Sequence, residues 1–294
     1  MREMRPTNTS KTYAPYAKKY LAFCADRGLS PKSDSSLSAF MFHGFKSKGL
    51  GRVTLTNTIP SAVADIFRFD NAHKPTDSGL VREMKKVITR MTPPSRGKLP
   101  VLVQHLKEMV ALAKPNEESI RNMFMMILMF MGFLRESELA GLKACDLWVE
   151  NLQGKEVLFI FVEMKKNDQE RHGHTIVLGS QPDSPLCPVT WYRAHLMVRR
   201  SSTHAFHHVW KSPKNLACDY PNTVLKRMVK SVGLDPALYG SHSLRRGGAS
   251  AAANAGVASH VIARHGDWKS DAVFLYITDA LANKLAVGDA ILNA

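Results

Sequence analysis

Four side chains near the C-terminus could act together on a phosphate group. His242 and Arg245 are three residues apart, so they share one face of the chain if this segment is helical. A helix beginning near Ser241, a residue that favours the N-cap position, would project both from its first turns. The guanidinium would bind an anion and the imidazole could transfer a proton. Further on, Trp268 offers an indole N–H and Tyr276 offers an oxygen nucleophile.

A second arginine stands at the end of the most apolar stretch of the chain. Arg135 directly follows the run from Met123 to Leu134, which we expect to form a buried helix. A guanidinium anchored at the edge of a packed core is held rigidly, which suits bidentate binding of a phosphate. Glu138, three residues later, could orient Arg135 or a neighbour and is not expected to transfer protons. The alternative is an Arg–Glu pair that only caps a helix junction.

The elements that must position these residues fall into two groups separated by a proline-rich segment. Residues 8–90 carry mainly helical signals, with helices expected near 12–28, 35–41, 54–67 and 79–91. Residues 92–100 contain three prolines and cannot continue a helix. We therefore predict an N-terminal helical domain over 1–91, a linker over 92–100 and a second domain over 101–294.

The second domain combines several helices with two candidate strands. Helices are expected near 103–113, 119–134, 188–200 and 222–232, and from 241 onward with breaks near Gly256 and at 266–268. Strands are expected at 156–162 and 175–178, joined by the polar stretch 165–172 and Gly173. The small residues from Gly247 to Ala253 would let their helix pack very closely or approach a phosphate backbone. The predicted fold class is mostly α with one small antiparallel β-sheet.

The charge of the chain favours a polyanionic partner. The 294 residues carry a formal net charge of +15, and residues 1–99 hold 18 Lys and Arg against 7 Asp and Glu. The alternative is a well-solvated basic surface. Within 79–91 the helical spacing gathers one group of cations on a single side, and these are candidate nucleic-acid contacts: Arg82, Lys85, Lys86 and Arg90.

The order of motifs resembles the tyrosine recombinase (phage integrase) family. The marks are Arg-x-x-Glu-Leu at 135–139, His-x-x-Arg at 242–245, then a Trp and a Tyr. The resemblance implies an N-terminal core-binding domain, a catalytic domain and these catalytic residues: Arg135, Lys166, His242, Arg245, Trp268 and Tyr276. The ending is most similar to recombinases of eukaryotic mobile elements of the DIRS or Crypton type.

Two of the implied positions have neighbouring alternatives. The family keeps a catalytic lysine on a hairpin, and the stretch Lys-Asn-Asp-Gln resembles a Lys-Thr-Asp-Gln variant, which favours Lys166 over Lys165. Gly-Asp-Trp matches a Gly-x-Trp variant, which favours Trp268 over His265. Tyr276 follows Trp268 by eight residues, whereas nine are usual in the family. One residue rotates an α-helix by about 100°, so either the helix that carries Tyr276 starts differently or Trp268 lies on the preceding turn.

The resemblance implies cleavage and rejoining of DNA through a covalent 3′-phosphotyrosine on Tyr276. Arg135 and Arg245 would neutralise the non-bridging phosphate oxygens, and Lys166 would protonate the leaving 5′ oxygen. His242 would assist deprotonation of the tyrosine or steer a phosphate oxygen. Neither a metal ion nor a nucleotide cofactor is expected. Arg246 is interpreted as a DNA-backbone contact or the partner of a salt bridge.

Site-specific recombination is the predicted function, and two alternatives stay open: relaxation of DNA by a type IB topoisomerase, and a non-catalytic DNA-binding protein derived from a recombinase.

The expected partners are double-stranded DNA and further copies of the chain, in a tetramer on DNA, with no membrane association. The tail 277–294 is rich in apolar residues and would dock on a neighbouring subunit; the alternative is a tail packed on its own subunit.

The cysteines indicate the cellular compartment of the protein. The four cysteines are scattered without a Cys-x-x-Cys spacing, which predicts an intracellular, reducing compartment, the nucleus if the host is eukaryotic and otherwise the cytoplasm or nucleoid. The target DNA sequence, the preference for integration or excision, the host and any accessory proteins do not follow from the sequence.

Overall fold

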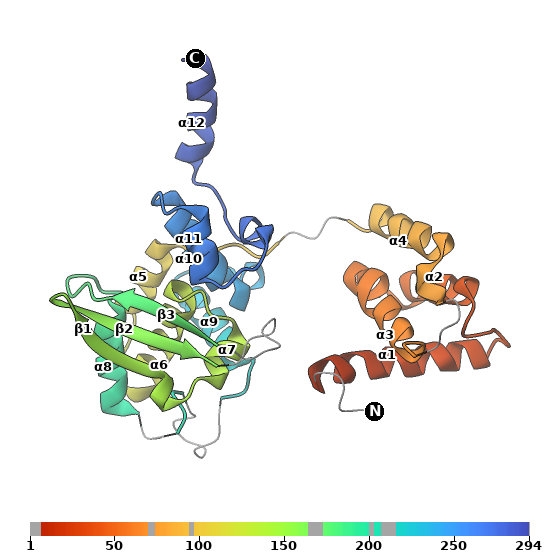
Figure 1. Ribbon diagram of the computed structural model, residues 1–294, viewed down its shortest axis with the longest axis horizontal. Coiled ribbons are helices and arrows are strands. Elements are labelled where there is room, and N and C mark those ends of the chain that lie inside the picture. The colour runs from red at the N-terminus through yellow and green to blue at the C-terminus, as the bar shows by residue number, and fades with distance from the viewer. Residues whose placement is uncertain are drawn as a thin grey trace. The chain divides into compact units, whose positions relative to one another are not determined.

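The chain divides into two compact units, Met1–Arg96 and Gly97–Ala294. The computed structural model (Figure 1) describes residues 7–69, 74–93, 97–163, 173–199, 203–206 and 216–293. The division falls inside the segment 92–100 that the prolines mark as non-helical. Each unit is built around a hydrophobic core of its own.

The N-terminal unit is a small bundle of helices. Its elements are α1 (Thr7–Ala25), α2 (Asp34–Lys48), a π-helical turn η2 (Thr54–Thr58) that runs into α3 (Ile59–Ile66), a 3₁₀ turn η3 (Pro75–Asp77) and α4 (Gly79–Met91). Aromatic and aliphatic side chains of all four α-helices form its core, among them Tyr20, Phe40, Ile59 and Ile88. The helices expected from the sequence are present.

Helix α4 shows why the basic residues gather as the sequence indicates. Only Val81 and Ile88, two turns apart, are buried along it. Arg82, Lys86 and Arg90 recur every four residues and are exposed, whereas Lys85 is half-buried. Lys86 pairs with Glu83 at 2.7 Å. The unit therefore presents a basic helix surface to solvent.

The second unit is mostly helical. Its helices are α5 (Val103–Ala111), α6 (Glu117–Met131), α7 (Glu136–Gly141), α8 (Pro188–Val198), α9 (Tyr220–Ser231), α10 (Ser241–Asn254), α11 (Ser259–His265) and α12 (Leu281–Leu292), with 3₁₀ turns η4 (Ala144–Asp146), η5 (Pro236–Leu238) and η6 (Asp271–Leu275). No described helix has the length and apolarity needed to cross a membrane.

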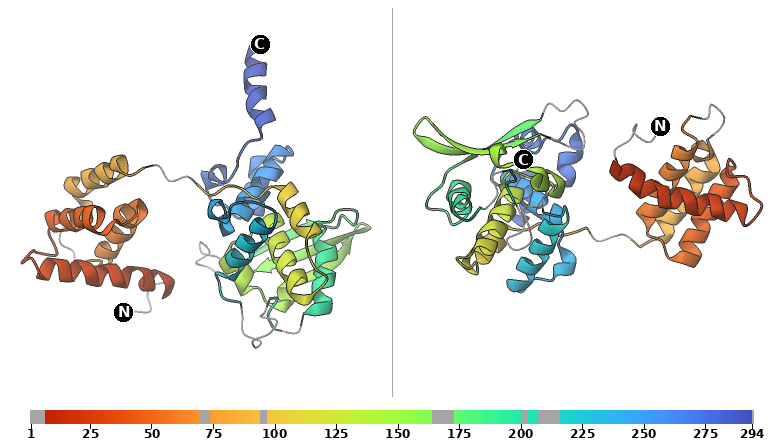
Figure 2. Two further views of the ribbon diagram at one scale, coloured as in Figure 1. Left: turned by 180° about the vertical axis from the view of Figure 1, so that it is seen from behind. Right: turned by 90° about the horizontal axis from the view of Figure 1, so that it is seen from below.

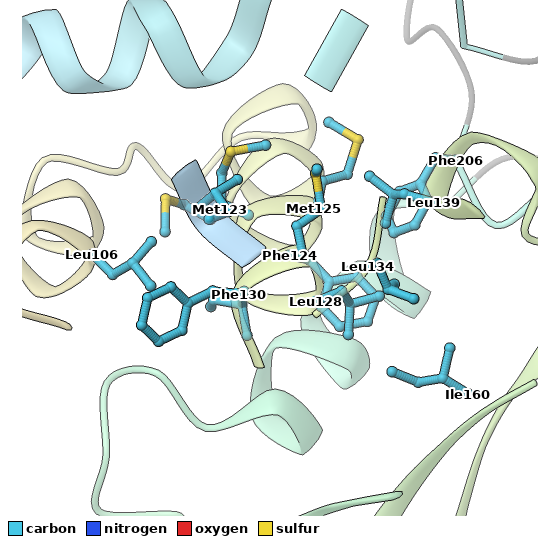
Figure 3. Close-up of a cluster of buried hydrophobic side chains, with 14 of the residues drawn as sticks. Leu106, Met123, Phe124, Met125, Leu128, Phe130, Leu134, Leu139, Ile160 and Phe206 are labelled. Carbon is cyan, nitrogen blue, oxygen red and sulfur yellow. The ribbon is translucent and has the colours of Figure 1, made fainter. Parts of the chain in front are cut away.

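Helix α6 is the centre of this unit. Every residue from Arg121 to Phe130 is buried, and the side chain of Asn116 caps the helix by accepting a hydrogen bond from Ser119 N at 2.9 Å. Figure 3 shows its methionines and Phe124 between Leu106 of α5, Leu139 of α7 and Ile160 of the sheet. The apolar run thus forms the predicted buried helix, and it ends at Met131, before the turn that carries Arg135.

Three antiparallel strands complete the second unit. They are β1 (Leu147–Leu152), β2 (Lys155–Val162) and β3 (His174–Gly179), in the order β1-β2-β3, with α8 packed against β2 and β3 (Figure 2). Leu147, Ile160 and Ile176 are register partners and face the core. The two predicted strands and the predicted fold class are confirmed. Strand β1 was not predicted.

Helix α10 approaches backbone atoms of the rest of the unit very closely at two glycines. A Cβ atom added to Gly247 would lie 1.9 Å from the carbonyl oxygen of Val101, and one added to Gly248 would lie 1.9 Å from that of Phe130. The run of small residues therefore serves close packing on α6 and on the segment that enters this unit. Nothing larger than hydrogen fits at either position.

We expect Gly248→Ala to lower the free energy of unfolding of the second unit by about 1–3 kcal/mol, because the methyl group must push α10 away from Phe130. Gly288→Ala in α12, where an added Cβ meets nothing within 4 Å, is the matched control. It should be neutral or stabilising by up to about 1 kcal/mol. Urea unfolding followed by circular dichroism measures both, and equal stability of Gly248→Ala and wild type would contradict the close contact.

Candidate active site

Arg245 lies at the centre of the site and is almost completely buried, with 1% of its surface exposed. Its Nη1 donates to the carbonyl oxygen of Phe133 and its Nη2 to that of Gly266 at 2.7 Å. Its guanidinium carbon lies 4.0 Å from the centre of the Trp268 ring. Burial, and then repulsion from Arg135, lowers the pKa of Arg245 to about 10. The side chain stays charged at neutral pH and is fixed by backbone groups.

Arg135 approaches Arg245 from the turn between α6 and α7. It is the N-cap residue of α7, and Glu138 accepts a hydrogen bond from its backbone N at 2.8 Å. The other oxygen of Glu138 accepts from the Arg135 guanidinium. Because Glu138 is buried, this double contact fixes the direction of Arg135. These contacts fit the orienting role predicted for Glu138 and also form a helix cap, which is the alternative, so its role stays a prediction.

Tyr276 directly follows the 3₁₀ turn η6. Ser270 is the N-cap of this turn, and its hydroxyl accepts a hydrogen bond from Ala272 N at 3.4 Å. Its ring lies 5.1 Å from that of Trp268, centre to centre, and its hydroxyl lies 3.4 Å from His242 Nδ1. The expected helix around Tyr276 is thus 3₁₀ and not α. With Trp268 on the turn before it, the spacing of eight residues is accommodated.

His242 is exposed on the first turn of α10, three residues before Arg245. The helix begins at Ser241 as expected, but Ser241 is not its N-cap. Gly240 occupies that position, and Ser243 Oγ accepts a hydrogen bond from Gly240 N at 3.0 Å. This cap leaves the Ser241 side chain available to other groups.

Trp268 and His265 lie on different sides of the turn at Gly266. The Trp268 ring contacts both Arg245 and Tyr276, whereas His265 Nε2 donates to the carbonyl oxygen of Met131 at 2.7 Å. Its ring stands edge-on to Phe133 at 4.7 Å. The geometry favours Trp268 as the residue that faces a substrate and gives His265 a supporting role, pinning α11 to the end of α6.

One cavity of about 470 Å³ brings these groups together. Five predicted catalytic residues line it: Arg135, His242, Arg245, Trp268 and Tyr276. Its walls also contain residues that the sequence analysis did not select as functional, namely Glu136, Cys218, Ser241 and Lys269. Two guanidiniums, an imidazole and a phenol around one space can bind a tetrahedral anion and attack it.

Lys165 and Lys166 lie outside the described residues. The strands on either side are described, and His174, the first residue of β3, contacts the carbonyl oxygen of His265 through Nε2 at 3.1 Å. This contact joins the start of β3 to the last residue of α11, directly before Gly266-Asp267-Trp268. The choice between the two lysines stays a prediction.

The residues predicted to contact DNA are found in both units. Arg82, Lys85, Lys86 and Arg90 belong to α4 of the N-terminal unit. Arg246 donates from Nη1 to the carbonyl oxygen of Lys98 at 2.7 Å, so it fastens the start of the second unit to α10. This contact with a backbone carbonyl is neither of the two expected for Arg246, and its role as a DNA contact stays a prediction.

Comparison with known proteins shows the family of the chain. The phage integrase family model matches residues 101–280. An "Integrase/recombinase xerD homolog" from Selenomonas ruminantium is 26% identical over 291 residues, covering 92% of this chain and 81% of the relative.

Two solved structures with similar folds are the Tn1549 transposon integrase with transposon right end DNA and a lambda integrase dimer bound to a COC′ core site. The first has a TM-score of 0.68 at 14% identity and covers 100% of this chain and 96% of the other. The second has a TM-score of 0.62 at 16% identity and covers 94% and 73%.

A buried Arg245 and a partly exposed Arg135 beside a tyrosine, on a mostly helical unit with a three-stranded sheet, fit a phosphoryl-transfer site with a tyrosine nucleophile. The chain belongs to the phage integrase family and is a tyrosine recombinase. The family resemblance seen in the sequence is confirmed. The finer assignment to eukaryotic mobile elements stays a prediction.

The half-buried His265, next to this site, should make stability depend on pH. Burial lowers the pKa of His265, with repulsion from His174 and Arg245 acting in the same direction. A depressed pKa means that the folded state disfavours the charged ring. Its contribution to stability is therefore complete above the unfolded value of about 6.5 and is lost as pH falls through the lower folded value.

We expect His265→Gln, which retains an N–H donor for Met131 but does not titrate, to be less sensitive to acid than wild type. His260→Gln changes an exposed histidine of the same helix and should keep the wild-type dependence. Melting temperatures recorded from pH 8 down to pH 5 test this. Identical slopes for the two variants would show that His265 does not titrate with unfolding.

Proposed function

We propose that this protein is a site-specific recombinase that cleaves and rejoins DNA strands through a covalent 3′-phosphotyrosine on Tyr276. The observation that carries the proposal is the convergence of Tyr276, His242, Arg135 and Arg245 on one cavity. The relatives named above are integrases and recombinases, which favours strand exchange over simple relaxation of DNA.

In this proposal the two arginines bind the scissile phosphate before the reaction starts. Arg245, fixed by two backbone carbonyls, and Arg135, fixed by Glu138, neutralise the non-bridging oxygens as negative charge builds on them. Preorganised cations need little rearrangement during the step, so their stabilisation applies to the transition state. The indole of Trp268 packs between Arg245 and Tyr276 and holds both in place.

The bond changes balance as a transesterification. The Tyr276 oxygen forms a bond to phosphorus while the bond from phosphorus to the 5′ oxygen breaks, which leaves a 3′-phosphotyrosine and a free 5′ hydroxyl. His242, 3.4 Å from the tyrosine hydroxyl, can accept its proton or steer a phosphate oxygen. Lys166 protonates the departing 5′ oxygen. A 5′ hydroxyl from a second strand reverses the step.

The basic surface of α4 supports a role for the N-terminal unit in holding DNA. Its exposed cations, Arg82, Lys86 and Arg90, can bind phosphates while the second unit performs the chemistry. Because 92–100 joins the units, we propose that they close around the duplex as a clamp.

We also propose that the protein acts in a reducing compartment of the cell. The four cysteines form no disulfide, which supports this proposal.

Tyr276→Phe should abolish covalent attachment to DNA and leave DNA binding nearly unchanged, because only the attacking hydroxyl is lost. The test is trapping on a nicked DNA substrate that releases a short fragment after cleavage, followed by mass spectrometry of the linked peptide. Tyr239→Phe, at a buried tyrosine outside the cavity, is the control for the loss of a phenolic hydroxyl. A phosphotyrosyl adduct on any other tyrosine would overturn the assignment.

We also propose that the recombinase assembles as a tetramer on DNA through α12. None of the described residues of this helix is buried, and it stands clear of the other helices in Figure 1. Leu281, Ile291 and Leu292 are each at least 70% exposed. The alternative of a tail packed on its own subunit has no support in these exposures. Large apolar side chains gathered on a surface mark a docking site.

An apolar groove of about 380 Å³ between β3, α10 and α11 offers the complementary surface. Val177, Val257 and Val261 line it and are each more than 40% exposed. A helix from a second copy could cover them and bury its own leucines. At its base α12 is fixed by Asn254, whose side chain bonds to Thr278 O, Ala280 N and the Asn283 side chain.

Truncation after Asp279 should therefore remove assembly and retain DNA binding and first-strand cleavage. Leu285→Glu should have the same effect, because it places a charge on the apolar helix. Lys284→Glu introduces the same charge without removing an apolar side chain and is the matched control. Sedimentation of the protein–DNA complexes measures assembly. If the truncated chain sediments like the full chain, α12 does not mediate assembly.

A further inference from the structure

His174, the first residue of β3, donates a hydrogen bond to the end of α11. Its Nε2 lies 3.1 Å from the carbonyl oxygen of His265, the last residue of that helix. Because a carbonyl oxygen only accepts, Nε2 of His174 must carry a hydrogen. The two residues are 91 positions apart in the chain. This bond therefore connects the sheet to a helix that lies beside the candidate active site.

The next carbonyl group of the chain binds the Arg245 guanidinium. It belongs to Gly266, and its oxygen accepts from Arg245 Nη2 at 2.7 Å. The carbonyl groups at the end of a helix have no partner within the helix and need donors from elsewhere. At the end of α11, two consecutive carbonyls therefore receive donors from two different elements: His174 of β3 and Arg245 of α10.

Trp268 depends on the same turn. A Cβ atom added to Gly266 would lie 1.9 Å from Cζ3 of Trp268, so the indole ring packs directly on the bare backbone of the glycine. The backbone N of Trp268 donates to the carbonyl oxygen of Ala263 at 2.8 Å, and its ring centre lies 4.0 Å from the guanidinium carbon of Arg245. A displacement of the turn would therefore move both the carbonyl that binds Arg245 and the ring that packs on it.

The end of α11 is held from two sides. On one side the His265 ring donates from Nε2 to the carbonyl oxygen of Met131 at 2.7 Å, which attaches α11 to the end of α6. On the other side His174 binds the His265 carbonyl. Helix α11 has only 7 residues, and so short a helix is not stable without tertiary contacts. These two bonds, together with the burial of Ile262, fix where it ends.

We propose that His174 is a positioning residue for the proposed strand cleavage. Its bond to the His265 carbonyl fixes the turn at Gly266, and that turn places Arg245 and Trp268 around the scissile phosphate. The inference rests on the proposed function, in which Arg245 neutralises a non-bridging oxygen. It adds that a residue of the sheet controls the position of a guanidinium that belongs to α10.

Hydrogen exchange of the free protein tests the first step. The backbone N–H groups of Gly266 and Trp268 bond to carbonyls within α11, so their exchange reports whether the end of the helix is held. We expect the peptide 262–268 to exchange about tenfold faster in His174→Ala than in wild type. His174→Gln keeps an N–H donor at about the reach of Nε2 and should exchange like wild type. His174→Asn has a shorter amide and should exchange like His174→Ala.

Cleavage rates test the second step. The substrate is the duplex on which trapping at Tyr276 locates the scissile phosphate, with either the normal phosphate or a neutral methylphosphonate at that position. A methylphosphonate lacks the negative charge that Arg245 neutralises, so a displaced Arg245 matters less on it. We expect His174→Ala to cleave the normal duplex about tenfold more slowly than wild type, and the methylphosphonate duplex at nearly the rate of wild type on that duplex. His174→Gln should restore the rate on the normal duplex.

Thr175→Ala is the matched control, because Thr175 follows His174 in β3, is exposed and points to the opposite face of the sheet. It should leave both measurements unchanged. Unchanged exchange in His174→Ala would overturn the proposal, and so would an equal loss of rate on the two duplexes, which indicates general damage to the fold. Restoration of His174→Ala by a sulfur-bridged 5′ leaving group, which needs no proton, would also overturn it, because the effect would then act through the general acid.

The role of His174 and the proposed function can fail separately. Hydrogen exchange is measured on the free chain without DNA, so it tests the contact even if no phosphotyrosine forms. Covalent trapping of the wild type on Tyr276 tests the chemistry whatever the variants of His174 do. If wild type forms a phosphotyrosine and His174→Ala exchanges like wild type, only the role of His174 is wrong.

Discussion

The burial of one guanidinium organises the second unit. Arg245 is held by the carbonyl oxygens of Phe133 and Gly266, which belong to two turns far apart in the sequence. Phe133 has a positive φ of 49°, an unusual conformation for a phenylalanine, and its carbonyl binds this guanidinium. A buried charge without such partners would cost several kcal/mol. The α6–α7 turn, α10 and the turn before Trp268 must therefore come together for the unit to fold.

The same constraint connects stability with catalysis. The turn that presents the Phe133 carbonyl also carries Arg135, and the turn at Gly266 also carries Trp268. Backbone groups that bind the Arg245 guanidinium thus place the other predicted catalytic side chains around it. Ser250, one turn beyond Gly247 on α10, bonds to the backbone of Tyr276 and Thr278 and fixes the segment after the proposed nucleophile. A single helix therefore sets the positions of His242, Arg245 and Tyr276.

The sequence predicts those parts of the fold that depend on local patterns. The apolar run before Arg135 requires a buried helix, and the order of the motifs indicates the catalytic set. Strand β1 has only three consecutive apolar residues, Leu147 to Val149, and it is defined mainly by pairing with β2. The separation of Trp268 from His265 depends on Asp267, whose φ of 51° turns the chain between them. The surroundings of Glu136 come from α9 and α10, which lie about a hundred residues away in the chain.

The packing of α6 divides the second unit into a part that can vary during evolution and a part that cannot. On most sides α6 presents methionines, including Met123, Met125, Met126 and Met129, whose flexible side chains can adjust to changes in their neighbours. Towards α10 it presents the bare backbone at Phe130, and α10 meets it with Gly248. Mutations elsewhere in the core can be absorbed by rotamer changes, but this contact has no side chain that could adapt. The sequence can therefore drift widely around α6 while the distance from the core to the catalytic helix stays the same.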